Sequence, residues 1–299
     1  MAAPAGGPDK HNPVAGILWM VCAAICFSAS LTLVKALQDG GISVFQTVLF
    51  RQVFGLLIFT PVLIRGWPGL LKSEVRPRHF FRAATGFTGM CCAYFSLTLI
   101  NLGESVALQF TLPFFTMLFA VWFLGEKVRS HRLIAAAIGF AGVLVIVRPG
   151  FSELNSGIFF ALAGAAFYAA SDTTARFVAR YDPLPAIMVY NFLFVILLAA
   201  IPSAIWWVTP ATDLWPQILG FVIAGVGAQF CLTKSFSSAE ASLVSPILFL
   251  RLPLVAVIGF FVFDQTTGLL TWVGAGVIVT ATLWMTHVET RNQRAAQAA

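Results

Sequence analysis

Ten long apolar stretches constrain the fold of this chain more than any other feature. They cover residues 14–37, 42–64, 79–100, 104–124, 131–147, 156–178, 184–206, 215–236, 240–263 and 270–287. A helix needs about 20 mostly apolar residues to cross a bilayer. Only helices and closed barrels satisfy their backbone hydrogen bonds in lipid. Barrel strands alternate apolar and polar residues, whereas these stretches are continuously apolar. The sequence therefore predicts an all-α membrane protein with ten transmembrane helices.

The composition supports a chain solvated largely by lipid. Only 10% of the 299 residues are charged and 59% are hydrophobic, whereas soluble domains carry about 25% charged residues. The first apolar stretch is too long for the apolar core of a signal peptide, so we expect a true first span. All five cysteines lie inside predicted spans without the spacing of metal ligands. We therefore expect packing cysteines, no metal and no disulfide framework.

The chain nearly repeats itself after 141 residues. The matched pairs are Gly16 with Gly157, Phe27 with Tyr168, Ser30 with Ser171, Lys35 with Arg176, and Pro61 with Pro202. Each copy holds five predicted spans, and an odd number places the second copy upside down relative to the first. We predict a tail over 1–13, a first repeat over 14–150, an inverted second repeat over 151–287 and a tail over 288–299.

The positive charges indicate how the chain is oriented. When alternate connections are assigned to opposite sides, 14 of the 18 Lys and Arg residues fall on the side of the N-terminus. Positive residues favour the cytoplasmic side, so both termini are predicted to be cytoplasmic, with the chain in the inner membrane. The basic run over 65–82 fits a cluster beside anionic lipid, and we expect no nucleic-acid partner.

Two arginines lie near the predicted bilayer midplane. Arg51 is about ten residues into the second span, and Arg251 is about eleven residues into the ninth. An arginine at this depth is costly and faces either a cavity or a partner. One interpretation is structural, with each guanidinium paired to backbone carbonyls or to Asp172, the single deeply placed acid. The other is functional, with a positive field that attracts a substrate carboxylate. Because Asp172 could neutralise only one arginine, a deep cation is expected to remain.

Other polar residues within the spans are candidates for binding or for bending. The substrate-binding candidates beside Arg51, Arg251 and Asp172 are Tyr94, Gln109, Tyr168, Asn191 and Gln229. The alternative for the two glutamines is hydrogen bonding between helices. The kink candidates are Pro113, Pro246 and Pro253, because proline removes a helical hydrogen bond. Pro113 and Pro253 lie 140 residues apart, close to the repeat offset, which favours a shared mechanical role.

Enzyme chemistry is not indicated by this sequence. All four histidines lie at predicted cytoplasmic ends of the spans, and no phosphate-binding GxxxxGK[ST] loop or HExxH helix is present. We therefore expect neither an enzyme nor a bound cofactor. A pump for organic cations would need a deep carboxylate, whereas here the deep charge is positive, which favours zwitterionic or anionic cargo.

These residues resemble the EamA-type members of the drug/metabolite transporter superfamily over about residues 14–287. The most specific segment is PFFTMLFAVWFLGE, from Pro113 to Glu126, and LFRQVFGLLIFTP around Arg51 is similar to the second span of the family. The second copy departs from the pattern, with Phe263-Asp264 where Gly-Glu is expected and with Arg251 before Pro253. The resemblance implies ten helices, cytoplasmic termini and bacterial export of small metabolites, amino acids included.

The leading hypothesis is therefore a monomeric secondary transporter that exports amino acids, aromatic ones included, by alternating access around a central cavity. Substrate and membrane lipid are its expected partners. The first alternative is an exporter of drugs and toxic organic cations with the same fold. The second is a membrane scaffold that transports nothing, although a scaffold has no need of polar residues near the midplane.

Overall fold

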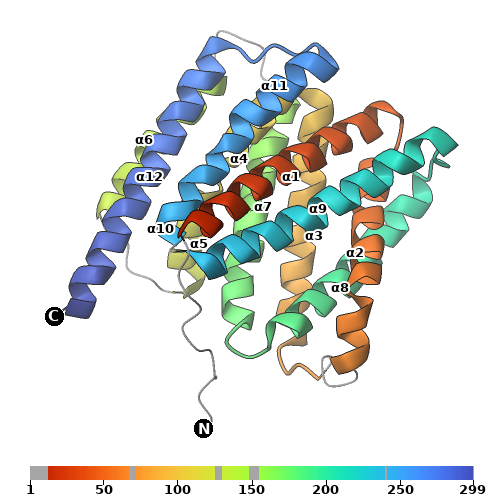
Figure 1. Cartoon of the computed structure of the whole chain (residues 1–299), viewed down its shortest axis with the longest axis horizontal. Coiled ribbons are helices and arrows are strands. Elements are labelled where there is room, and N and C mark those ends of the chain that lie inside the picture. Colours follow the sequence, from red (N-terminus) through yellow and green to blue (C-terminus); the bar gives the residue numbers. More distant parts are fainter. Residues whose placement is uncertain (1–12, 67–71, 125–129, 148–154, 240, 299) are drawn as a thin grey trace.

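Every predicted span forms a helix in the computed structural model, which describes residues 13–66, 72–124, 130–147, 155–239 and 241–298 (Figure 1). The first half holds α1 (Pro13–Asp39), α2 (Val44–Gly66), α3 (Arg76–Leu99), α4 (Leu102–Gln109), α5 (Leu112–Leu124) and α6 (Ser130–Val147). The second half holds α7 (Ser156–Val178), α8 (Leu184–Ile205), η2 (Thr212–Leu214), α9 (Trp215–Ser238), α10 (Ala241–Val244), η3 (Ser245–Leu250), α11 (Arg251–Phe263) and α12 (Leu269–Ala298). The described chain contains no strand, so the all-α prediction is confirmed.

Eight segments of the described residues are long and apolar enough to cross a membrane. The two predicted spans outside this set are α3 and α6. Helix α3 carries Arg76, Arg78 and Arg82 in its first two turns, which lowers its mean hydropathy. The apolar part of α6, Leu133–Val147, is short. The predicted tail over 1–13 and the Gly125-Glu126 end of the motif lie outside the described residues, apart from Pro13.

Two predicted spans are broken near their prolines. The span predicted over 104–124 is divided into α4 and α5, with Phe110 and Thr111 between them. The span predicted over 240–263 is divided into α10, η3 and α11. Proline cannot donate a backbone hydrogen bond, which favours a break just before Pro113 and a tighter 3-10 turn at Pro246. The breaks fall at corresponding places in the two halves, and the role of these prolines as hinges stays a prediction.

The C-terminal helix is longer than predicted. We expected the last span to end at residue 287 and to be followed by a tail, but α12 continues to Ala298. Residues 288–298 contain neither glycine nor proline, and Ala, Arg, Gln and Glu dominate them. These residue types have high helix propensity, so nothing in this segment ends the helix.

Four pairs of helices make the most extensive contacts in the molecule: α1 with α9, α3 with α7, α2 with α8, and α6 with α12. Each pair joins one helix of the first half to one of the second. Figure 1 shows α6 and α12 together along one edge, while the other pairs form the body of the molecule. The two halves therefore interlock and do not form separate lobes.

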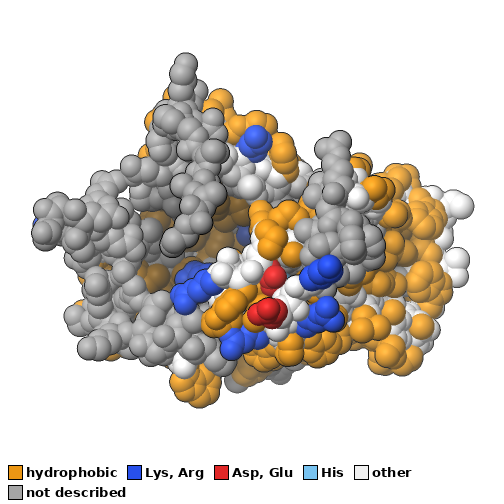
Figure 2. All heavy atoms as spheres, turned by 90° about the horizontal axis from the view of Figure 1, so that it is seen from below, with side chains coloured by type: hydrophobic (Ala, Val, Ile, Leu, Met, Phe, Trp, Pro, Cys, Tyr) orange, Lys and Arg blue, Asp and Glu red, His pale blue; other side chains and the backbone are white. Residues whose placement is uncertain are grey.

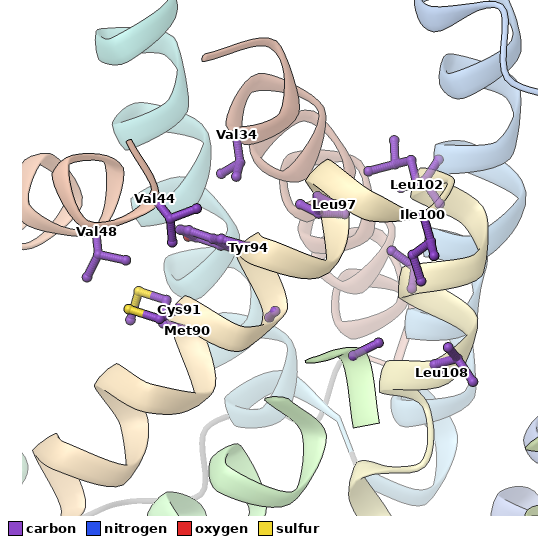
Figure 3. Packing of buried hydrophobic residues seen from close by; sticks show 14 of the residues in the cluster. Val34, Val44, Val48, Met90, Cys91, Tyr94, Leu97, Ile100, Leu102 and Leu108 are labelled. Carbon is purple, nitrogen blue, oxygen red and sulfur yellow. The ribbon is translucent and has the colours of Figure 1, made fainter. Parts of the chain in front are cut away.

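The α3–α7 pairing relies on two glycines. A Cβ atom on Gly89 of α3 would lie 3.2 Å from the carbonyl oxygen of Gly164, and a Cβ atom on Gly164 of α7 would lie 3.2 Å from that of Gly89. The backbones of α3 and α7 therefore approach as closely as small residues permit. Around this contact, Met90, Cys91 and Tyr94 of α3 lie near valines of α2 in the main apolar core (Figure 3).

Charged side chains gather at one end of the molecule. The α2–α3 and α7–α8 connections lie at this end, and Figure 2 shows Lys and Arg around acidic side chains here. Asp182 Oδ2 accepts a hydrogen bond from Ser73 Oγ at 2.6 Å and lies 2.8 Å from His79 Nε2, so the two connections are tied together. We refer to this end as the basic end and to the opposite one as the outer end.

Candidate functional site

Arg51 lies where four helices meet. It projects from α2, and its Nη1 donates a hydrogen bond to the Tyr94 hydroxyl of α3 at 2.9 Å. Its Nε lies 4.0 Å from the position that a Cβ atom on Gly225 of α9 would occupy, and Ser30 Oγ of α1 lies 3.5 Å from the same position. The glycine at 225 thus leaves room for a bulky guanidinium that is mostly buried.

Arg251 approaches the interior from the second half. It begins α11, directly after the 3-10 turn η3, and its guanidinium carbon lies 4.9 Å from the centre of the Phe27 ring of α1. This distance is within the range of a cation–π contact. Its Nε is buried and has no hydrogen-bond partner. The guanidinium is therefore held by a ring face, while part of its hydrogen-bonding capacity is unused.

Tyr168 of α7 lies within electrostatic range of both arginines. Its hydroxyl interacts electrostatically with both Arg51 and Arg251. Tyr168 and Phe27 occupy the same position in the two repeats, 141 residues apart, and both contribute an aromatic ring here. We refer to Arg51, Arg251, Tyr94, Tyr168 and Phe27 as the two-arginine site.

The proposed pairing of Asp172 with a deep arginine is wrong. Asp172 interacts electrostatically with Arg82 and Arg176, not with Arg51 or Arg251. It lies one turn beyond Tyr168 toward the basic end, where its side chain is exposed. Ion pairs of the described residues include Lys35 with Asp39 and His79 with Asp182. No described carboxylate neutralises either arginine of the site.

The remaining sequence candidates do not join the two-arginine site. Asn191 Oδ1 of α8 accepts a hydrogen bond from Arg82 Nη1 at 3.0 Å. Gln109 Nε2 donates to Ser105 Oγ at 3.3 Å within α4. Gln229 lies one turn from Gly225 on α9 and is exposed. Among the described residues, no group of three or more His, Cys, Asp or Glu side chains could hold a metal ion.

Sequence reasoning missed two residues of this neighbourhood. Phe27 was matched to Tyr168 in the repeat, but nothing in a run of apolar residues marks which ring meets a cation. Arg82 was counted only as an orienting charge near a membrane surface. The structure instead places it inside the bundle, with its Nε buried and without a hydrogen-bond partner.

The outer end is closed by polar contacts between helices. Lys35 Nζ of α1 donates to the carbonyl oxygen of Leu97 in α3 at 3.0 Å and lies 5.5 Å from the centre of the Phe263 ring. Gln46 of α2 both donates to and accepts from the backbone of Val208, at 2.7 Å and 3.2 Å. These contacts join the two halves on the outer side of the arginines.

The basic end is more open. On the inner face of α9, Ile218 and Val222 in the outer half are 0% and 3% exposed, but Gln229 and Thr233 farther along are exposed. The inner face of α7 changes in the same way, from buried Ala165 to exposed Asp172. Because residues four apart share one helix face, the change shows that packing loosens toward the basic end.

Thiol labelling tests this difference. In a variant whose five natural cysteines are replaced by alanine, we expect Gln229→Cys to react rapidly with a water-soluble maleimide in membranes open at the basic end. Val222→Cys, two turns away on the same face, should react far more slowly because it is packed. Equal labelling rates at the two positions would contradict an opening confined to one end.

The family of the chain is apparent from known sequences. The EamA-like transporter family matches residues 14–148 and 155–287, so each of the two predicted repeats corresponds to one copy of the family. These matches confirm the resemblance seen in the sequence. They also agree with the expectation that the chain is not an enzyme.

Named relatives cover almost the whole chain. The S-adenosylmethionine uptake transporter of Rickettsia bellii is 25% identical over 92% of this chain and 94% of its own length. The riboflavin transporter of Vibrio cholerae is 26% identical over 95% and 97%. The pseudopaline exporter of Pseudomonas aeruginosa is 27% identical over 92% and 96%. The chain is thus similar to transporters with different cargoes and directions.

One solved crystal structure shares the fold. It aligns with a TM-score of 0.59 and 19% identity over 90% of this chain and 98% of its own. At this level of identity the likeness concerns the path of the backbone alone. It shows that the arrangement of helices described above occurs in another protein.

Proposed function

Because the chain belongs to the EamA-like transporter family and is a multi-pass membrane transporter of that type, we propose that it exports small carboxylate-bearing metabolites. Amino acids and their derivatives are the leading class of cargo. The single observation that carries this proposal is the two-arginine site, where Arg51 and Arg251 approach α1 one turn apart, near Ser30 and at Phe27, without an acidic partner among the described residues. The proposed setting is the bacterial inner membrane, with both termini in the cytoplasm.

The proposed architecture is ten spans in two inverted repeats of five. The helix contacts support this arrangement. The repeat offset matches α1 with α7 and α3 with α9, so exchanging the halves turns the α1–α9 contact into the α7–α3 contact. The α2–α8 and α6–α12 pairs each join a helix to its own counterpart. Such exchange is expected of two copies related by a pseudo-two-fold axis in the membrane plane.

The proposed mechanism uses the site at the junction of the halves. A substrate carboxylate enters from the open basic end and accepts hydrogen bonds from the guanidinium groups, while its side chain packs on the rings of Phe27 and Tyr168. Arginine suits this task because its planar fork matches a carboxylate. Movement about the breaks near Pro113 and Pro246 then closes the basic end and separates the contacts around Lys35 and Gln46 at the outer end.

Transport by the purified full-length chain in proteoliposomes tests this function. We expect saturable flux of labelled carboxylate-bearing metabolites, absent from protein-free liposomes and reduced by excess unlabelled substrate. Counterflow in everted membrane vesicles then measures the direction. Flux of organic cations without flux of any carboxylate would contradict the proposal and favour the cation exporter. Specific binding without any flux would favour a non-transporting membrane protein.

A further inference from the structure

The charge of the two-arginine site carries information on the cargo beyond the presence of a carboxylate. Arg51 contributes one positive charge from the first half, and Arg251 contributes another from the second. Arg51 donates a hydrogen bond to the neutral Tyr94 hydroxyl, and Arg251 lies over the neutral Phe27 ring. Asp172, one turn from Tyr168, interacts electrostatically with Arg82 and Arg176. The site therefore holds two positive charges that no described side chain compensates.

A single carboxylate would compensate only one of the two arginine charges. Buried charge is costly unless it is paired and hydrogen-bonded. One carboxylate would neutralise one guanidinium and leave the other uncompensated. A zwitterionic substrate would add an ammonium group, for which the described part of the site offers no carboxylate. A ligand with two acidic groups compensates both arginines and uses the free Nε of Arg251.

The aromatic side chains around the arginines indicate which group the ligand carries besides its acidic groups. Phe27 and Tyr168 present rings at equivalent positions of the two repeats, and Tyr94 packs edge-to-face with Phe221, with ring centres 6.3 Å apart. Aromatic walls of this kind favour a flat ring, which stacks or packs edge-on. An unbranched dianion without a ring would leave these walls without contact.

We propose that the cargo of this site is a dicarboxylate that also carries an aromatic ring, with one carboxylate on Arg51 and the other on Arg251. This inference rests on the proposed transport function and narrows its substrate class. The two arginines come from opposite halves of the chain, so a bridging dianion also links the halves. It thereby stabilises the conformation in which both arginines face one site.

A matched pair of probes tests the inference by binding alone. N-benzoylglutamate carries two carboxylates and a ring, whereas N-benzoylglutamine has the same shape with one carboxylate replaced by an amide. Calorimetric titration of the full-length protein in nanodiscs should show the dianion binding about 10- to 100-fold more tightly, as expected for one additional charge-assisted pairing. Phenylalanine, a zwitterion with a ring, should bind no better than the amide.

Variants show whether each arginine is responsible. Arg51→Gln and Arg251→Gln should each remove the preference for the dianion, so that both probes bind with similar affinity, while Arg251→Lys should retain part of it. Gel filtration and a thermal melt establish that each variant is folded, and the lysine variant supports the test should a glutamine variant fail to fold. An unchanged preference for the dianion in folded Arg51→Gln and Arg251→Gln would overturn the assignment to the arginines.

The outcomes separate this inference from the transport proposal. Equal binding of the two probes, or binding of neither, overturns the dicarboxylate class. Flux of zwitterionic amino acids with no dianion preference would do the same and would leave the transport function intact. A strong, arginine-dependent preference for N-benzoylglutamate without flux of any compound would support the inference and contradict the proposed transport.

Discussion

Replacing Arg51 by leucine should reduce transport per folded molecule by about 100-fold, because the substrate carboxylate would lose a charge-assisted hydrogen bond in a desolvated site. The measurement is initial flux into proteoliposomes, normalised to folded protein. Arg51→Lys should keep the charge but lose the planar fork, and should fall between leucine and the natural residue. Tyr94→Phe removes only the acceptor at 2.9 Å and should have a smaller effect.

The stability of the same variant distinguishes a binding role from a structural role. An uncompensated arginine in a span is costly, so Arg51→Leu should leave the apparent melting temperature unchanged or raise it. Gln52→Met on the neighbouring position of α2 is the control, because Gln52 is also buried but its side-chain amide lies against the Met90 sulfur, 3.9 Å away. It should retain normal flux. A lower melting temperature of Arg51→Leu with unchanged flux would show that Arg51 serves the fold alone.

Much of the architecture follows from the sequence because its signals are local. Continuous apolar runs predict helices, and Pro113 and Pro246 predict breaks, since both depend on one segment at a time. The depth of Arg51 and Arg251 was predicted in the same local way, because helix rise converts a count of residues into a distance, and it stays a prediction. These features can be predicted without knowing where the neighbouring helices lie.

The partners of the charged residues could not be predicted in the same way. Lipid and protein interior are both apolar, so hydropathy does not fix how a span is rotated about its axis. The rotation of α7 decides that Asp172 meets Arg82 and Arg176. The placement of α1 decides that Phe27, and no other ring of that span, meets Arg251. The continuation of α12 past residue 287 was missed because a drop in hydropathy was taken as the end of the helix.

The compensated lysine at the closed outer end contrasts with the two arginines of the site. Lys35, a buried cation near the outer end, is satisfied by the Leu97 carbonyl and lies 3.7 Å from Asp39. The arginines below it have no comparable compensation. The chain therefore provides partners for one buried cation and leaves the two arginines available. This arrangement is expected where the available charges serve a ligand that binds and dissociates.

The second large effect is expected at Gly164, where α7 meets α3. A Cβ atom at this position would lie 3.0 Å from the backbone nitrogen of Ala93, next to Tyr94 of the site. Gly164→Val forces the two backbones apart, and overpacking of this kind costs about 1–3 kcal/mol. We expect the apparent melting temperature to fall by roughly 2–6 °C. Flux should fall as well, because Tyr94 and Tyr168 move apart.

Gly276→Val provides the matched control for this variant. Gly276 also lies inside a helix, α12, but a Cβ atom there meets nothing within 4 Å. Both substitutions change helix propensity in the same way, so the difference between them isolates the α3–α7 contact. Equal melting temperatures of the two variants would contradict a close backbone approach at Gly164. A selective loss at Gly164 would instead show that the contact between the two halves holds both tyrosines beside the arginines.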